Sequence, residues 1–142
     1  LVAGAFGEAK PLEASTNRAA TSQLPERWVQ MQDGTRFLIR TEDEYLYAEA
    51  ELSQAVVKDG GFALCELKRE GSEWVGVCRS RLPFKCGRRW VWCTIESRER
   101  VFSVTPTRIE GESQTYDAQD LDCRSCTVRR WKSVRFSLIP EH

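Results

Sequence analysis

Six cysteines are the residues of this sequence with the clearest chemical potential: Cys65, Cys78, Cys86, Cys93, Cys123 and Cys126. An even number of cysteines in a chain of 142 residues is typical of disulfides that form in an oxidising compartment. Six cysteines permit many pairings, and the sequence alone does not choose among them. We therefore predict a disulfide-bonded extracytoplasmic protein that is secreted, periplasmic or attached to the cell surface.

The spacing of the thiols gives less support to redox or metal chemistry. Cys123 and Cys126 form a C-x-x-C pair, but a redox-active pair usually lies at a helix N-terminus, whereas a polar loop is expected here. A zinc site made of two such pairs needs a second C-x-x-C, and six residues separate Cys86 from Cys93. We expect neither a bound metal nor a cofactor.

Conventional catalytic groups are scarce in this chain. The only histidine is His142, so His-based nucleophilic triads and most metal-assisted hydrolysis are excluded. The sequence contains no nucleophile elbow and no phosphate-binding glycine loop. Carboxylates gather in one stretch, which holds Glu42, Asp43, Glu44, Glu49 and Glu51. We expect a non-enzymatic protein, and an enzyme that uses only carboxylates is the third functional hypothesis.

One segment combines basic and aromatic residues: Arg79, Arg81, Lys85, Arg88, Arg89, Trp90 and Trp92. Guanidinium groups beside indole rings are suited to an anionic polysaccharide, through charge and cation–π contacts. The alternative is a solvated loop whose charges keep a sheet edge soluble. The formal net charge of zero argues against a general nucleic-acid binder. No apolar run approaches the ~18 residues of a membrane span.

Short strands must position these residues, because hydrophobicity alternates with a period of two from Trp28 onward. The pattern predicts strands at 35–40, 45–52, 62–70, 73–80, 90–98, 101–105, 107–116 and about 133–138, with Pro106 separating two of them. About seven or eight short strands indicate an all-β protein, either an antiparallel barrel or a sandwich. We predict one β-domain over residues 27–142, preceded by an irregular arm at 1–26.

The clearest unit is a hairpin whose two strands are joined by Gly71 and Ser72. Glycine takes the positive φ that a type II′ turn requires at its first central position. The resulting register places Cys65 opposite Cys78.

If the next strand continues this meander, Cys93 joins the two cysteines of the hairpin on one face, with Cys86 beside them in a proline-containing loop. That cluster can hold two disulfides if Cys86 takes one partner, while Cys123 and Cys126 can bond to each other.

The opposite face of these three strands is also apolar, and it carries Phe62, Leu64, Val75, Val77, Trp90 and Trp92. An antiparallel sheet commonly leaves one face polar. We therefore expect this second face to be covered, either by the chain itself, by a hydrophobic ligand inside a barrel, or by a partner protein.

Several short strings between Cys65 and Gly111 carry a resemblance: Cys65–Lys68, Trp74–Ser80, Trp92–Cys93 and Thr105–Gly111. With them, residues 62–140 resemble small exported cysteine-containing bacterial proteins of unknown function, which are often predicted to be lipocalin-like barrels. The resemblance implies a barrel that binds an apolar ligand and transfers no catalytic residues. The chain lacks the G-x-W signature of lipocalins near its first strand.

The N-terminal arm, residues 1–26, also bears on the predicted function. Leu1–Ala5 is similar to the end of an export signal, and the arm has few large apolar side chains with which to fold alone. It is suited to pair with a sheet edge on another subunit. We predict an extracytoplasmic domain that acts by contact, as a subunit or module of a surface or extracellular assembly, with self-association or a protein partner. The alternative is a small barrel that binds a hydrophobic ligand.

Overall fold

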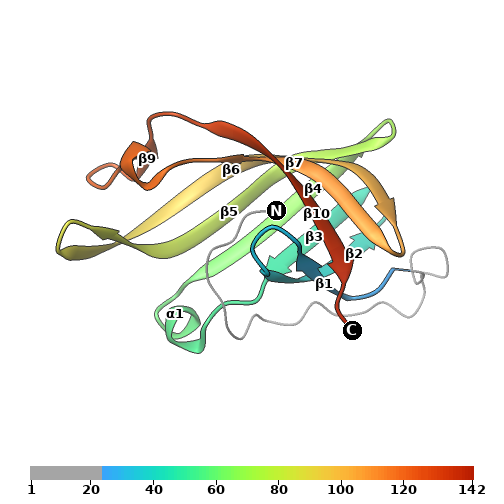
Figure 1. Ribbon diagram of the computed structural model, residues 1–142, viewed down its shortest axis with the longest axis horizontal. Coiled ribbons are helices and arrows are strands. Elements are labelled where there is room, and N and C mark those ends of the chain that lie inside the picture. The colour runs from blue at the N-terminus through green and yellow to red at the C-terminus, as the bar shows by residue number, and fades with distance from the viewer. Residues whose placement is uncertain (1–23) are drawn as a thin grey trace.

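A computed structural model describes residues 24–142 as an antiparallel β-barrel (Figure 1). Its strands follow each other around the barrel in the order β1-β10-β7-β6-β5-β4-β3-β2. The barrel is closed because β1 pairs with β10 on one side and with β2 on the other. The all-β prediction is confirmed, and of its two architectures the barrel is the one that forms.

The elements are β1 (Arg27–Gln30), β2 (Arg36–Glu42), β3 (Tyr45–Ala50), α1 (Gln54–Lys58), β4 (Phe62–Glu70), β5 (Glu73–Cys86), β6 (Arg89–Thr105), β7 (Arg108–Thr115), the 3-10 helix η1 (Ala118–Asp120), β8 (Leu121–Asp122), β9 (Thr127–Val128) and β10 (Lys132–Pro140). Eight of the strands form the barrel, and β8 and β9 form a separate two-stranded sheet.

The hairpin predicted around Gly71 and Ser72 is confirmed in its register. Cys65 pairs with Cys78, and Leu67 pairs with Gly76. Gly71 has a φ of 65°, in the left-handed region that the turn requires. Gly76 is needed for a different reason, because a Cβ atom at this position would overlap the backbone oxygen of Glu66.

Two strands are longer than the sequence pattern predicts. β5 continues through Pro83 to Cys86, where a loop was expected. This stretch has β6 on one side only, since the pairing with β4 ends at Phe62 and Arg81, and proline is tolerated on such an edge. β6 is one strand of 17 residues rather than two, and its irregularity is a bulge between Val101 and Ser103.

The short helix α1 was not predicted. Its N-cap is Ser53, whose hydroxyl accepts a hydrogen bond from the Val56 backbone N–H at 3.3 Å. None of its residues is buried, so the amphipathic pattern by which helices are recognised is missing. Among the described residues, no helix is long and apolar enough to cross a bilayer.

Alternate residues of the strands fill the barrel, which explains the period of two in the sequence. The largest fully buried apolar side chains are Trp28, Leu46, Leu52, Leu67, Val101, Ile109 and Leu138. Trp28 is 0% exposed, and its indole Nε1–H donates to the backbone oxygen of Pro25 at 2.7 Å. Filling of this kind is expected, because the interior of an eight-stranded barrel is only wide enough for side chains or one small ligand.

All six cysteines form disulfides: Cys65–Cys78, Cys86–Cys123 and Cys93–Cys126. The expected disulfide chemistry is therefore confirmed. The suggestion that Cys123 bonds to Cys126 is wrong, as is the suggestion that Cys86 bonds within the hairpin cluster. Cys86 ends β5 rather than lying in a loop, and its side chain meets a distant segment of the chain. An oxidised C-x-x-C redox pair bonds to itself, whereas Cys123 and Cys126 bond to two different cysteines, and a zinc site needs free thiolates.

Candidate functional site

One hairpin of the barrel extends well beyond its neighbours. β5 pairs with β4 only as far as Arg81, and β6 pairs with β7 only from Glu99 onward. Residues 82–93 therefore pair only with each other, and residues 94–98 of β6 have β5 as a neighbour but not β7. Residues 82–98 are here called the extension, which is visible at the left of Figure 1. A two-stranded hairpin is at best marginally stable alone, so this extension needs support from elsewhere in the chain.

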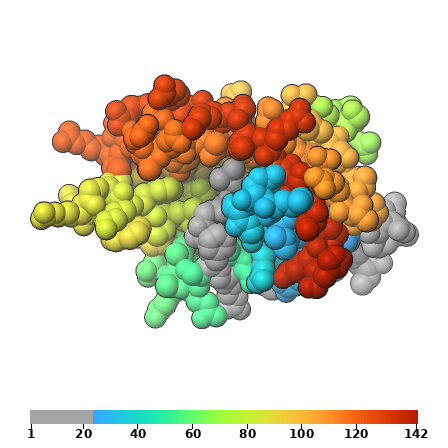
Figure 2. Space-filling view, in the orientation of Figure 1, coloured from blue at the N-terminus to red at the C-terminus, as the bar shows by residue number. Residues whose placement is uncertain are grey.

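The support comes from residues 116–131, here called the cap. The cap contains η1, β8 and β9, and the disulfides Cys86–Cys123 and Cys93–Cys126 tie it to the extension. Figure 2 shows the two segments protruding together at one end of the molecule. A second core lies between them, made of buried Cys93, Ile95 and Leu121 with partly buried Phe84, Val91, Tyr116, Cys126, Val128 and Trp131.

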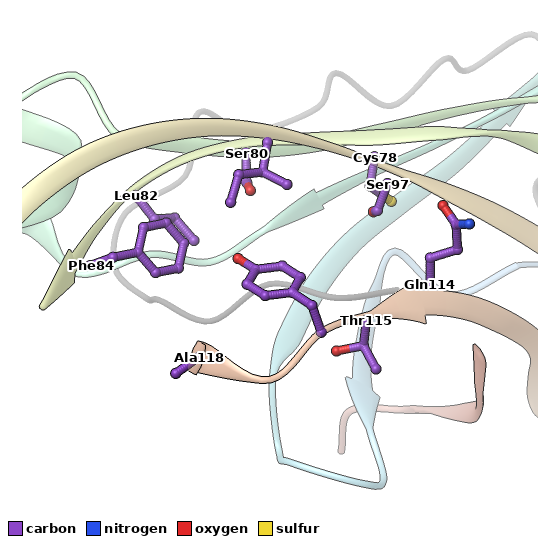
Figure 3. A pocket seen from close by; sticks show the side chains of 10 residues that line it. Cys78, Ser80, Leu82, Phe84, Ser97, Gln114, Thr115 and Ala118 are labelled. Carbon is purple, nitrogen blue, oxygen red and sulfur yellow. The ribbon is translucent and has the colours of Figure 1, made fainter. Parts of the chain in front are cut away.

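A pocket of about 290 Å³ lies at the junction of the barrel, the extension and the cap (Figure 3). Two groups of residues line this pocket. Strands β5 and β6 contribute Cys78, Ser80, Leu82, Phe84, Ile95 and Ser97. The end of β7 contributes Gln114 and Thr115, and the start of the cap contributes Tyr116 and Ala118. The wall is apolar around Leu82, Phe84 and Ile95. Serine hydroxyls and the Gln114 amide provide a few hydrogen-bonding groups, as is usual in small-molecule sites.

Aromatic rings form one end of this pocket. The rings of Phe84 and Tyr116 have centroids 6.4 Å apart, and Tyr116 meets Trp131 edge to face at 5.5 Å. Burial raises the pKa of the Tyr116 phenol to about 12. The phenol therefore stays neutral at physiological pH and can donate a hydrogen bond.

A buried carboxyl group lies next to the pocket. Glu99 is 1% exposed and accepts hydrogen bonds from the Ser113 hydroxyl at 2.5 Å and from the Ser97 hydroxyl at 3.4 Å. Ser97 is itself a wall residue, so it connects this carboxyl to the pocket. Burial raises the pKa of Glu99 above its ordinary value, and the two serine hydrogen bonds oppose that rise.

The second apolar face predicted from the sequence is the outer wall of the barrel. The cysteine face points inward, so a ligand inside the barrel would not cover this set. Leu64, Val75 and Trp90 are 45%, 37% and 64% exposed, so the chain itself does not cover these side chains. Cover by a partner protein stays a prediction. Phe62 and Val77 are partly buried and line an outer groove of about 540 Å³, together with Tyr47, Leu64, Glu66 and Arg79.

The predicted basic residues separate into two groups. Arg79 and Arg81 lie within β5, where Arg79 pairs with Glu96 at 3.0 Å and Arg81 donates to the backbone oxygen of Asp59. The guanidinium of Arg81 also lies 4.4 Å from the ring centroid of Trp92. The second group, Lys85, Arg88 and Arg89, is at the tip of the extension beside Trp90 and forms no salt bridge with a described residue.

The acidic stretch is divided between a turn and a strand. Glu42, Asp43 and Glu44 are exposed at the β2–β3 turn, while Glu49 is buried and pairs in register with Leu64, on the outer side of β3. Within residues 24–142, no group of three His, Cys, Asp or Glu side chains is placed to hold a metal ion.

Comparison of the chain with protein-family models, with curated proteins and with solved structures finds no match. The resemblance to small exported bacterial proteins therefore stays a prediction.

Sequence reasoning did not identify Ser80, Ser97, Glu99 or Tyr116 as site residues. A signal for the first three was present, because the register that places Cys65 opposite Cys78 also turns these three inward. Polar side chains at inward positions of a barrel strand indicate an end of the apolar core, where a polar pocket can form. Tyr116 gave no such signal, since it belongs to the cap, whose position depends on disulfides that sequence could not assign.

Proposed function

We propose that this protein is a non-enzymatic extracytoplasmic binding domain, and that it holds a small, mostly apolar molecule in the junction pocket. The observation that carries this proposal is the pocket itself, at the open end of a closed barrel whose other interior positions are filled. Eight-stranded barrels hold one small ligand in a comparable place. From the sequence, a barrel that binds a hydrophobic ligand was the alternative function. The pocket now favours it over a subunit of an assembly.

The wall of the pocket favours a particular ligand. Leu82, Phe84 and Ile95 suit an aromatic or aliphatic body, and the hydroxyls of Ser80 and Ser97 suit one hydrogen-bonding group. An anionic group is disfavoured, because no Lys or Arg side chain lines the pocket and a charge taken out of water needs a partner. The proposed ligand is therefore neutral. The volume of the pocket is at the lower limit of the usual range for small-molecule sites, so the ligand is small.

Support for the compartment and for the absence of catalysis is separate from the pocket. Three disulfides suit an oxidising space, because cytosolic thiols are kept reduced. The sequence holds a single histidine, and the acidic stretch is divided between the exposed β2–β3 turn and the outer side of β3.

Two fluorescent probes that share an aromatic body test this proposal: neutral N-phenyl-1-naphthylamine and anionic 8-anilino-1-naphthalenesulfonate. We expect the neutral probe to bind with a Kd on the order of 10 µM and the sulfonate at least about tenfold more weakly. Fluorescence titration of the folded protein measures both affinities.

A pair of matched variants locates the binding. Ser80→Phe fills the pocket and should abolish binding of the neutral probe. Thr94→Phe makes the same kind of change on the exposed outer side of the same hairpin and should leave binding unchanged. Equal affinity in the two variants, or tighter binding of the sulfonate, would contradict the proposal.

The function that ranked first from the sequence, a subunit of a surface assembly, becomes the second candidate. The exposed apolar groove on the outer wall, with Leu64 and Val77, favours a contact role. Self-association through the N-terminal arm stays a prediction, because nearly all of residues 1–26 lies outside the described residues.

A further inference from the structure

The free end of the extension concentrates positive charge in a protein with no net charge. Lys85, Arg88 and Arg89 surround the turn between β5 and β6. On the barrel wall, by contrast, Arg36, Arg100 and Arg108 each have an acidic partner, at 3.2, 2.8 and 3.4 Å. Cations that lack a protein partner keep their full charge available for an external anion.

The cap, which two disulfides attach to this end of the molecule, carries two further cations, Arg124 and Arg129. Arg124 follows Cys123 directly, and Cys123 is bonded to Cys86 at the end of β5. Arg129 follows β9, and its backbone N–H donates to the Asp120 oxygen at 2.7 Å, which fixes this part of the cap. Neither arginine forms a salt bridge with a described residue. The Cys86–Cys123 bond therefore brings Arg124 close to the end of β5, where Arg89 is the register partner of Cys86.

The surface also contains one acid. The pKa of Asp122 is held below its ordinary value, chiefly by the hydrogen bond from the Arg124 backbone N–H, with smaller effects from the charges of Arg129 and Arg124. One carboxylate against five cations leaves a strong positive excess at this end of the molecule.

An exposed aromatic ring completes the surface. Trp90 pairs in register with Lys85, and its 64% exposure is the highest among the exposed large apolar side chains of residues 24–142. An indole face that carries partial negative charge attracts the C–H groups of a sugar ring or a neighbouring cation. Trp90 and Lys85 lie on the outer face of the hairpin, whereas Cys86 and its register partner Arg89 lie on the face that meets the cap. The Cys86–Cys123 bond fixes the end of β5 between these two faces, so binding costs little ordering entropy.

We propose that the residues around this end of the molecule bind an acidic polysaccharide that crosses the turn between β5 and β6. They are here called the basic tip: Lys85 and Trp90 on the outer face of the hairpin, and Arg88, Arg89, Arg124 and Arg129 at the turn and on the side of the cap. Carboxylate or sulfate groups pair with the cations, and a sugar ring stacks on Trp90. The polymer class rests on the extracytoplasmic location proposed above. Insertion into a bilayer is disfavoured because Trp90 is the only exposed large apolar side chain of the tip.

Binding of the full-length protein to a heparin oligosaccharide and to oligogalacturonate tests the proposal. Arg88→Glu with Arg89→Glu should weaken both affinities at least about tenfold at 50 mM salt, and Arg124→Glu with Arg129→Glu should do the same. The second pair is decisive because only the disulfide-bonded cap brings these residues to the tip. Trp90→Ala should weaken binding about fivefold without changing its salt dependence.

The matched control is Lys68→Glu with Arg69→Glu. These are two adjacent exposed cations beside the β4–β5 turn, at the opposite end of β5 from the tip. This control makes the same change in net charge and should alter the affinity less than twofold.

Three results would overturn the proposal. The first is an equal loss of affinity in the control, and the second is full affinity in the Arg124→Glu and Arg129→Glu variant. The third is binding to anionic phosphatidylglycerol vesicles or to single-stranded DNA that is at least tenfold tighter than binding to either saccharide. The neutral probe of the junction pocket should bind all these variants normally. Failure of the tip and failure of the pocket are therefore distinguishable.

Discussion

Removing both disulfides that attach the cap should lower the free energy of unfolding by more than the sum of the two single removals. Cys86–Cys123 closes a loop with a sequence separation of 37 residues, and Cys93–Cys126 closes one of 33 residues. The two loops overlap almost completely. Once one bond is present, the other closes a ring of only about 12 residues, made of 86–93 and 123–126.

The chain-entropy model converts these loops into free energies of unfolding. Replacing one cysteine pair by alanine frees only the small ring and should cost ~2.8 kcal/mol, whichever pair is removed. Replacing both pairs frees the large loop as well and should cost ~6.6 kcal/mol. The double loss therefore exceeds the sum of the single losses by ~1 kcal/mol, which is larger than the usual error of additivity between independent sites.

Urea unfolding followed by tryptophan fluorescence measures these values. All variants are compared in one osmolyte-stabilised buffer, so that the weakest remains folded. Alanine replacement of Cys65 and Cys78, whose separation of 13 residues lies outside the overlapping loops, is the control, and its cost of ~3 kcal/mol should add independently to either cap bond. Strict additivity of the two cap bonds would refute the reasoning.

Two further predictions concern the barrel wall and the pocket. Gly76→Ala should destabilise the barrel by at least ~2 kcal/mol in the same urea assay, because the new Cβ meets backbone at Glu66 and Leu67; Gly71→Ala, which has open space and only a positive φ, should cost ~1 kcal/mol. Absorbance near 295 nm should show Tyr116 titrating at about pH 12 rather than near the ordinary value of 10.0. Since the unfolded chain loses this proton first, stability should fall as the pH rises from 10.0 toward 12, and Tyr116→Phe should remove that part of the loss.

The parts of the fold that depend on neighbours along the chain could be predicted from the sequence. The turn at Gly71 and Ser72 sets the register of β4 and β5, and that register correctly placed Cys65 opposite Cys78. Alternation likewise identified the inward face of β3, where Leu46, Ala48 and Ala50 are all buried. In each case a local rule and the burial pattern agree.

The parts that depend on distant segments could not be predicted. Pro83 indicated a loop, because the sequence does not say that β5 has already lost its β4 neighbour at this point. The cap contains few strand residues, and its position follows from the partners of Cys123 and Cys126, which were open from sequence. The pocket and half of the basic tip depend on this cap, so they could not be predicted either.

The extension and the cap support each other through two bonds and a small core, and neither has enough apolar surface to be stable alone. This arrangement places two chemically different surfaces on one rigid element. Inward positions of β5, such as Ser80 and Leu82, line the pocket, while the turn and Trp90 face away from it. A substitution on one side of the hairpin therefore leaves the other side intact, whereas reduction of the cap disulfides disturbs both. We therefore expect reduction of the cap disulfides to weaken binding at both proposed sites, while the barrel core, which includes Trp28 and Leu67, keeps its packing.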